Sequence, residues 1–336
     1  MTFQLFIGFD TGCDKLNWHA LNGQEVELGY GELANNTDSI RCWAEQLIHQ
    51  HDLCPQAILI CIEDTGLYSL KLAYQLQEQG FGVWLQDALQ IKQSIGRTKS
   101  KNDQLDAYRI TRYALRNQAD YQAFIPNNEV LLAIKSLISQ RKRLVKAKNL
   151  LQVPIGQERK FFPLQLPAEV YVQTDESVRQ LKAAIKAIDT QIDAWIARDE
   201  RYTRTVKILQ SLPGIGPANA RLMLIKTNNF ERGYAPKQLA SLFGIAPHER
   251  QSGKRLNRKP RTHPRVDREV KAGLYMGMIR QIPRDNKIAR YYARKIREGK
   301  HHNSIINAMA NIIVTTACAC LRKQVMYDKD YQHKLA

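Results

Sequence analysis

The first 125 residues alternate between short apolar runs and amphipathic stretches. The runs at 3–10, 56–64 and 81–87 are typical of buried strands, whereas 16–23 and 25–33 indicate an antiparallel meander that turns at Asn22-Gly23. Apolar residues at helical spacing predict helices, the first with its N-cap at Thr37 or Asp38 and the second closed by Gly80. A third helix is expected near residue 103. The order β-β-β-α-β-α-β-α predicts an α/β domain with a mixed sheet flanked by helices.

From about residue 127 the pattern becomes helical. A long helix with a basic face is expected over 127–152, and a second helix carries apolar residues at alternating spacings of three and four between Val178 and Trp195. This seam covers only about three heptads. It fits a coiled coil between chains or a helical hairpin within one chain, and both alternatives stay open. The stretch from about 264 to 325 also favours helices.

A glycine-containing turn interrupts the helical pattern in "LQSLPGIGPANARLML". Helix, Pro-Gly-Ile-Gly and helix form the helix-hairpin-helix pattern, in which Gly214 and Gly216 allow a tight turn. Their amides can approach a phosphate at the start of the second helix. We therefore expect contact with a nucleic-acid backbone that does not depend on base sequence. An ordinary tight turn between helices is the alternative.

The net charge of +18 over 336 residues indicates a polyanionic partner, which charge alone leaves as DNA, RNA or an acidic membrane surface. The most basic part of the chain is an expected loop over 246–265. Candidate phosphate contacts in this loop are Arg250, Lys254, Arg255, Arg258, Lys259 and Arg261.

The cysteines, the N-terminus and the lengths of the apolar runs indicate the cellular compartment. None of the six cysteines has the spacing of a metal site, so free thiols in a reducing cytoplasm are expected. The N-terminus lacks the pattern of a signal peptide, and no run of about 18 apolar residues predicts a membrane span. We therefore expect no membrane partner.

Four acidic residues stand out against this basic background. Asp10 and Glu63 end predicted strands, while Asp103 and Asp106 lie three apart on one face of a predicted helix start. Four carboxylates from three elements can converge beside one edge of the sheet, where two Mg²⁺ ions would take oxygen ligands and act on a phosphodiester. The alternative is simple surface pairing on the helix, Asp106 with Arg109.

Three acidic blocks in the chain resemble those of the DEDD insertion-sequence transposases, the IS-one-ten family. These blocks are "GFDTGCDKLNWHAL", "CIEDTGLYSLKLAYQL" and "TKSKNDQLDAYRITRYA". "LQSLPGIGPANARLML" followed by "LASLFGIAPHERQSGKR" is similar to the C-terminal transposase domain of the same family. The resemblance covers roughly residues 3–325, and the blocks occur in the family's order and spacing.

The resemblance implies a RuvC-like domain with an RNase H-type fold at residues 1–125, whose metal ligands would be Asp10, Glu63, Asp103 and Asp106. It implies a helical or coiled-coil linker at 126–200, a mostly α transposase domain at 201–325 and a tail at 326–336. In the family's "SG" block, Ser252 would be the nucleophile of a site composed from both domains, acting in cis or in trans.

The implied activity is bacterial DNA transposition through a phosphoserine link, with Mg²⁺, or Mn²⁺ in its place, as cofactor. The implied partners are the element ends and target DNA, a structured guide RNA encoded beside the gene, and further copies of the chain in a dimer or tetramer. The setting would be the cytoplasm, associated with the nucleoid. A guide RNA would read the target by base pairing, as in other RNA-guided systems.

Several alternatives stay open beside this interpretation. Asp14 and Asp64 adjoin the acidic blocks, but Asp64 should face away from Glu63 on the strand. Ser211 and Ser241 are alternative serines, although their apolar helical contexts favour packing. Three other activities would use much of the same sequence: a site-specific DNA invertase, a metal-dependent junction resolvase or nuclease with water as nucleophile, and a non-catalytic architectural protein.

Overall fold

The computed structural model describes residues 3–95, 102–126, 128–162, 166–252, 256–262 and 268–330, and for 248–262 it describes the backbone alone. The chain separates into two compact units, residues 1–126 and 127–336. Each unit has its own hydrophobic core.

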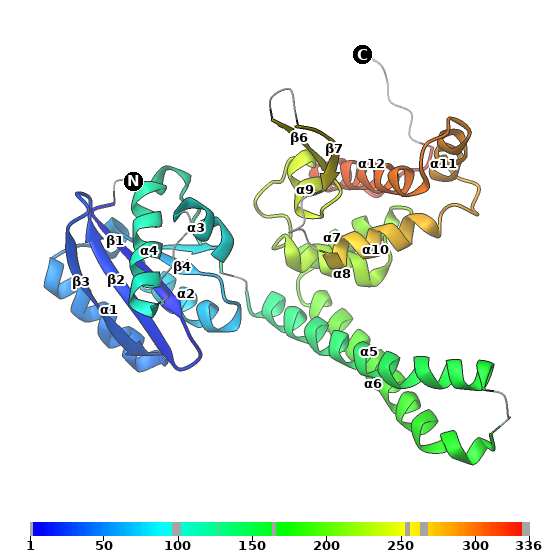
Figure 1. Cartoon of the computed structure of the whole chain (residues 1–336), viewed down its shortest axis with the longest axis horizontal. Helices are drawn as coiled ribbons and strands as arrows, with labels where there is room; N and C mark the ends of the chain where they lie inside the picture. Colours follow the sequence, from blue (N-terminus) through cyan, green and yellow to red (C-terminus); the bar gives the residue numbers. More distant parts are fainter. Residues whose placement is uncertain are drawn as a thin grey trace. The chain divides into compact units, whose positions relative to one another are not determined.

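Unit 1 is built on a five-stranded mixed sheet with the strand order β3-β2-β1-β4-β5 (Figure 1). β1 pairs antiparallel with β2, which pairs antiparallel with β3, whereas β4 and β5 run parallel to β1. The predicted mixed sheet and its element order are confirmed. The strands are β1 (Leu5–Thr11), β2 (Lys15–Asn22), β3 (Glu27–Ala34), β4 (Ile58–Glu63) and β5 (Gly82–Gln86).

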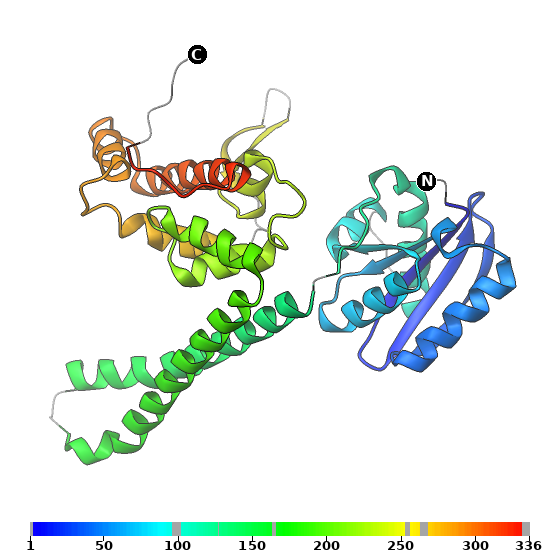
Figure 2. The ribbon, with the colours of Figure 1, turned by 180° about the vertical axis from the view of Figure 1, so that it is seen from behind.

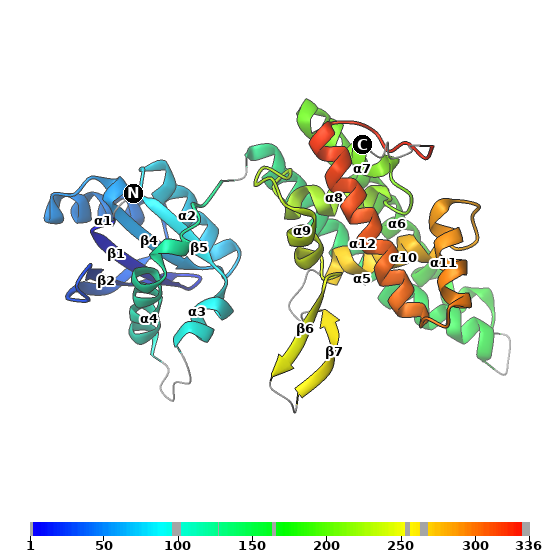
Figure 3. The same cartoon turned by 90° about the horizontal axis from the view of Figure 1, so that it is seen from above.

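The two faces of this sheet carry different helices, α1 (Thr37–His51) and α2 (Leu67–Glu78) on one, α4 (Asp103–Arg116) on the other (Figures 2 and 3). Side chains alternate between these faces along each strand, so one core lies under α1 and α2 and a second lies under α4. Three short helices complete the unit: η1 (Pro55–Ala57), α3 (Ala88–Ile95) and η2 (Gln118–Asp120).

The start of α1 differs from the prediction. Its N-cap is Asn36, whose side-chain oxygen accepts a hydrogen bond from the backbone amide of Ser39 at 2.8 Å. Thr37 and Asp38, the two predicted caps, are the first residues of the helix itself. Asn is as good a cap as Asp, so a run of Asn, Thr and Asp does not reveal from sequence which residue caps.

α4 lies unusually close to β1 because Gly8 has no side chain. A Cβ atom built on Gly8 would lie 2.6 Å from the carbonyl oxygen of Ala107 and would overlap the backbone nitrogen of Thr111. The hydroxyl of Thr111 donates at 2.9 Å to the backbone carbonyl of His19, or to that of Ala107 at the same distance. Backbone contact therefore fixes the height of α4 above the sheet.

Unit 2 begins with a long helical hairpin formed by α5 (Glu129–Phe161) and α6 (Val172–Ala197), with η3 (Ala168–Tyr171) before α6 (Figure 1). The seam predicted on α6 is buried or half-buried where α6 packs along α5 of the same chain. The intrachain hairpin is thus the alternative that the structure shows for this seam.

The hairpin is tied to the rest of unit 2 by an ion-pair cluster around the buried Arg221. Arg221 of α8 (Pro217–Lys226) is 7% exposed at its side chain and donates to Asp189 and, at 2.6 Å, to Asp193, both on α6. Arg141 of α5 donates to the same Asp189 carboxylate at 2.9 Å. Three helices therefore share one network of charge-assisted hydrogen bonds.

Within the described residues of unit 2, six further helices form the body and one strand pair is attached to it. The predicted basic loop over 246–265 is wrong in part, because β6 and β7 pair antiparallel within it and project from the body (Figure 3). These strands lack the apolar alternation that would have identified them. The elements are α7 (Glu200–Ser211), α8 (Pro217–Lys226), α9 (Pro236–Leu242), β6 (Pro247–Ser252), β7 (Leu256–Thr262), α10 (Arg268–Ile279), α11 (Lys287–Arg297) and α12 (His302–Lys323).

α12 is the central core helix of unit 2. Its length and composition alone would suffice to cross a membrane, and it is the single described helix of that kind. Ten of its residues are buried against the other helices of the unit, among them Ile306, Met309 and Val314. The apolar character of α12 is therefore explained by core packing.

Candidate functional site

The parallel pairing of β1 and β4 brings Asp10 and Glu63 to one end of the sheet. The register pairs Phe9 with Ile62, and each acid is the next residue on its strand. Alternation places both acids on the face covered by α4, since Phe6 and Cys61 on the same strand faces belong to the core under that helix. Two half-buried carboxylates thus lie on neighbouring strands beside α4.

Electrostatics shows which other acids belong to this cluster. Burial raises the pKa of Glu63 above its usual value, and the negative charges of Asp10, Asp106 and Asp87 raise it further, while Lys92 lowers it. Accumulated like charge disfavours the ionised carboxylate. The site therefore favours a cation or a proton at Glu63.

Asp106 and Asp103 stand in the first turn of α4, after the N-cap Asn102. Asp106 is half-buried and accepts a hydrogen bond at 2.6 Å from Arg109, the pair that a simple helix-surface interpretation predicts. Asp103 lies one turn earlier, is exposed, and is not among the charges that raise the pKa of Glu63. The charges of Asp10 and Asp106 thus act on Glu63, whereas Asp103 is an exposed residue at the start of the same helix as Asp106.

Two site residues were not identified from the sequence. Gln86, the register partner of Glu63 on β5, donates at 2.6 Å to the hydroxyl of Tyr113 on α4. Asp87 follows Gln86, and its carboxylate accepts from the amide of Leu89 at the start of α3. The available signal was position, because Asp87 ends a predicted strand just as Asp10 and Glu63 do.

The neighbouring acids have other contacts. The Asp64 carboxylate accepts from the backbone amide of Gly66 at 3.0 Å and so shapes the turn before α2. Asp14 is exposed beyond β1, and its backbone carbonyl accepts from Asn35 at 2.8 Å. Both acids thus have contacts in turns.

The donor set at this end of the sheet suits a hard divalent cation, which takes carboxylate oxygens. Within the part of the chain that the structure describes, no three His, Cys, Asp or Glu side chains are grouped closely enough to hold a metal ion. The raised pKa of Glu63 is the observation that favours one, since a cation would relieve the repulsion from Asp10 and Asp106.

In unit 2, the predicted glycine turn joins α7 to α8. Gly214 has φ +86° and packs against Gly277 of α10, where a Cβ on Gly277 would overlap the carbonyl oxygen of Gly214. Gly216 is the N-cap of α8, and a Cβ there would meet nothing within 4 Å. Gly214 therefore serves close backbone packing, whereas Gly216 borders open space.

The predicted serine and its basic neighbours lie on the β6–β7 pair. Ser252 is the last residue of β6 and the register partner of Leu256, while Arg250 is paired with Arg258. Lys259 and Arg261 are on β7. Gly253, Lys254 and Arg255 lie outside the described residues.

The two alternative serines, Ser211 and Ser241, both lie in helices of unit 2. The hydroxyl of Ser211 donates to the carbonyl of Ile208 at 2.7 Å and accepts from the amide of Tyr327 at 2.8 Å. Ser241 is half-buried in the short helix α9.

Comparison with known proteins agrees with these features. The family described as "Transposase IS116/IS110/IS902 family" matches residues 206–293, and a DEDD-type transposase family matches residues 7–153. The chain belongs to the IS116/IS110/IS902 transposases. Membership implies DNA cutting and recombination, and DEDD transposases are typically metal-dependent.

Relatives of this transposase fall into two groups. It is 25% identical over 288 residues to the "Pilin gene-inverting protein" of Moraxella bovis, covering 84% of this chain and 85% of the relative. It is 31% identical over 154 residues to the "Insertion element IS900 uncharacterized 42 kDa protein" of Mycobacterium paratuberculosis, covering 45% of this chain and 38% of the relative. The protein of insertion element IS110 from Streptomyces coelicolor is 25% identical over 145 residues.

Proposed function

We propose that this transposase cuts and rejoins DNA strands in a Mg²⁺-dependent reaction in which Ser252 forms a covalent link to DNA. The observation that carries the proposal is the position of Asp10, Glu63 and Asp106 at one end of the sheet, where the charges of Asp10 and Asp106 raise the pKa of Glu63. Carboxylates accumulated in this way are unfavourable unless a cation or proton is bound.

The fold of unit 1 supports the proposal. An antiparallel meander followed by two parallel strands, with order β3-β2-β1-β4-β5, is the arrangement expected of an RNase H-like, RuvC-like domain. In it the central strand β1 carries Asp10, β4 carries Glu63, and the helix against them carries Asp103 and Asp106.

The metal would be held by carboxylate oxygens of Asp10, Glu63, Asp103 and Asp106, as two Mg²⁺ ions for which Mn²⁺ can substitute. When bound, such ions neutralise charge on a phosphodiester and stabilise its pentacovalent transition state. Arg109 holds one oxygen of Asp106 and so orients that carboxylate.

The covalent step follows from the chemistry of serine. The hydroxyl oxygen of Ser252 attacks the scissile phosphorus and loses its proton, while the bond from phosphorus to the deoxyribose oxygen breaks and that oxygen takes up a proton. The number of phosphoester bonds is unchanged, so the strand can be rejoined to a new hydroxyl without ATP. Support comes from the place of Ser252 at the end of β6, opposite a basic strand.

Substitution of Ser252 tests this step. Ser252→Ala should abolish strand exchange and any SDS-stable adduct between protein and labelled DNA, while DNA binding persists. Recombination by Ser252→Ala at the wild-type rate would exclude the serine mechanism and favour a resolvase or nuclease that uses water.

We further propose that a structured guide RNA directs the reaction, that the protein works as a dimer or tetramer, and that it acts on nucleoid DNA in the bacterial cytoplasm. The α7–α8 turn would act as a helix-hairpin-helix, and the basic positions of β6 and β7, with Lys254 and Arg255, would contact phosphates. Sequencing the RNA that copurifies with the protein, expressed with its native flanking DNA, tests the guide. Only random host RNA would count against it.

Site-specific inversion is a second candidate, favoured by the match to the pilin gene-inverting proteins over 84% of the chain. The two activities differ in product. A plasmid with two recombination sites in inverted orientation would have its intervening segment reversed by an invertase, whereas a transposase would produce insertions at new sites.

A further inference from the structure

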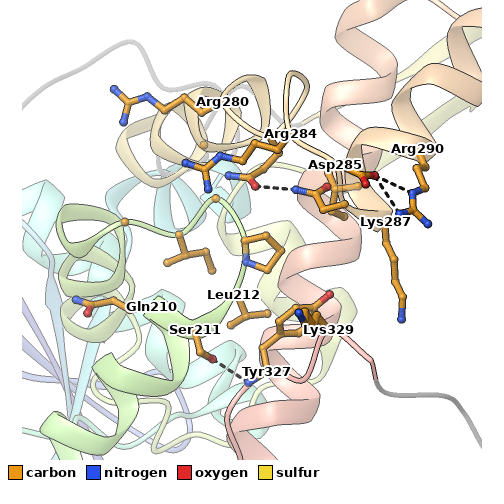
Figure 4. Close-up of a pocket in the computed structure, with 18 of the residues that line it drawn as sticks. Gln210, Ser211, Leu212, Arg280, Arg284, Asp285, Lys287, Arg290, Tyr327 and Lys329 are labelled. Carbon is orange, nitrogen blue, oxygen red and sulfur yellow. Dashed lines mark hydrogen bonds and ion pairs between the residues drawn. The ribbon is translucent and has the colours of Figure 1, made fainter.

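A cavity of about 840 Å³ lies in unit 2 (Figure 4). Three segments that are distant in sequence form its walls: the α7–α8 turn, the connection from α10 to α11, and the chain segment after α12. Five cationic side chains and only two carboxylates line it. The cations are Arg280, Arg284, Lys287, Arg290 and Lys329, and the carboxylates are Asp285 and Asp330.

The walls of this basic cavity are held by specific contacts. Gly214 and Gly277 touch backbone to backbone, which fixes the turn onto α10. The buried Gln281 accepts from Asn286 at 3.1 Å, and Asn286 in turn caps α11 by accepting from the amide of Ala289 at 2.9 Å. The cavity is therefore built into the fold.

The segment after α12 closes the remaining side. The amide of Tyr327 donates to the hydroxyl of Ser211, and a guanidinium nitrogen of Arg204 donates at 3.1 Å to the carbonyl of Gln324. These bonds place Lys329 on the cavity wall opposite Arg280 and Arg284 (Figure 4). The cations thus face the cavity from more than one side.

One carboxylate is already engaged. Asp285 accepts from two nitrogens of Arg290, at 3.0 and 3.2 Å, so this pair is largely neutral. Arg280, Arg284 and Lys329 are exposed, with their charged ends in reach of a ligand. The lining therefore keeps an excess of positive charge, which favours an anion with several charges.

We propose that this cavity binds the phosphodiester backbone of duplex DNA, with Arg280, Arg284 and Lys329 contacting successive phosphates. The inference rests on the proposed function, in that DNA is the substrate. Small-molecule sites are mostly apolar with a few polar groups, whereas long cationic side chains dominate this one. Such contacts position DNA without reading its bases.

Neutralising two cations tests the proposal. Arg280→Gln/Arg284→Gln should weaken binding of a random-sequence DNA duplex roughly tenfold at low salt. It should also reduce the slope of log affinity against log salt by about two, one for each lost phosphate contact. Fluorescence anisotropy across a salt series, in EDTA so that no cleavage occurs, measures both. Lys182→Gln/Lys186→Gln, which removes two exposed cations of α6, is the matched control and should change neither as much.

Asp285→Asn is a test with the opposite sign. It removes a negative charge and releases Arg290, so affinity for the duplex should rise roughly threefold. A purely structural role for these residues predicts no gain. Unchanged or weaker binding by Asp285→Asn, with unchanged melting temperature, would overturn the proposal.

The outcomes also separate the cavity from the catalytic proposal. If Arg280→Gln/Arg284→Gln binds duplex DNA normally while Asp106→Asn loses Mg²⁺-dependent cleavage, the cavity assignment alone fails. If neither Asp106→Asn nor Ser252→Ala affects the reaction, the catalytic proposal fails and the binding result stands by itself. A loss confined to structured RNA, with duplex DNA bound normally, would overturn the assignment to DNA.

Discussion

The acidic end of the sheet in unit 1 and the basic cavity in unit 2 both depend on a close contact between two backbones, but they carry opposite charges. In each, a glycine lets two backbones touch: Gly8 beneath α4, and Gly277 beneath the α7–α8 turn. The acids are short side chains, so their positions follow directly from the backbone. The cations are long and flexible, so they tolerate small shifts of the elements that carry them.

Side-chain positions must be more precise at the acidic site than around the basic cavity. Misplacing a catalytic group by about 1 Å can cost roughly a hundredfold in rate, whereas phosphate contacts by Arg and Lys are mainly electrostatic. We therefore expect substitutions in unit 1 to act steeply on chemistry. Substitutions around the basic cavity should act gradually on affinity.

The largest expected effect is that of Asp106→Asn. Loss of one carboxylate should lower Mg²⁺-dependent cleavage by about a thousandfold or more, because metal binding supplies several kcal/mol of transition-state stabilisation. DNA binding should be kept or strengthened, since a negative charge is removed. Asp120→Asn, an exposed acid in η2, is the control and should cleave normally. Equal activity of the two variants would contradict the catalytic role.

Gly8→Ala tests how closely α4 must approach the sheet. The new methyl group would meet the backbone of Ala107 and Thr111, so we expect unit 1 to lose about 3 kcal/mol of unfolding free energy. Cleavage should fall as well, because Asp106 is displaced from Asp10. Gly23→Ala has open space around its Cβ and should change stability by less than about 1 kcal/mol. Thermal unfolding of both variants measures the two changes in stability, and equal stability of the two would contradict the close approach at Gly8.

Gly277→Ala makes the matching change in unit 2. Its Cβ would overlap the carbonyl oxygen of Gly214, so unit 2 should lose about 2 kcal/mol and DNA affinity should fall a few-fold. Gly156→Ala on α5 has nothing within 4 Å and should stabilise that helix by about 0.5–1 kcal/mol. If Gly277→Ala unfolds at the wild-type temperature, the backbone contact does not hold the cavity together.

The smallest expected effect concerns Glu63. Its pKa is raised by burial and by Asp10 and Asp106, so protonation favours the folded state. Without metal, this group should add stability as pH falls through its raised pKa toward the usual value near 4.5, and that gain should be lost as pH rises. Glu63→Gln should therefore raise the melting temperature at neutral pH in EDTA by about 1–3 °C.

Added Mg²⁺ provides the counterpart to this measurement. It should stabilise the wild-type protein more than Glu63→Gln, because the variant has lost a ligand. An equal shift in both proteins would show that Glu63 does not bind the ion.

Much of unit 1 could be predicted because each element has a local signature. Buried strands appear as apolar runs, and the ends of parallel strands meet, so Asp10 and Glu63 were expected side by side. The contact at Gly8 could not be predicted, since a glycine in a strand does not reveal which backbone approaches it. Asp87 ends a predicted strand, but this position alone does not show that its charge acts on Glu63.

The structure of unit 2 was harder to predict, because it depends on contacts between segments that are distant in the sequence. An apolar seam from Val178 to Trp195 fits a partner helix from the same chain as well as one from another, and chain topology decides. The β6–β7 pair lacks apolar alternation, which is the signal that identifies strands. The basic cavity joins residues near 214, 284 and 329, which no local pattern connects.

The cluster around Arg221 makes the helical hairpin and α8 one mechanical body. Moving α5 and α6 away would break the hydrogen bonds from Arg221 to Asp189 and Asp193 and leave only water to replace them. Because Arg221 stands in the same short helix that Gly216 caps, a displacement of the hairpin would act on α8 close to the glycine turn that borders the basic cavity.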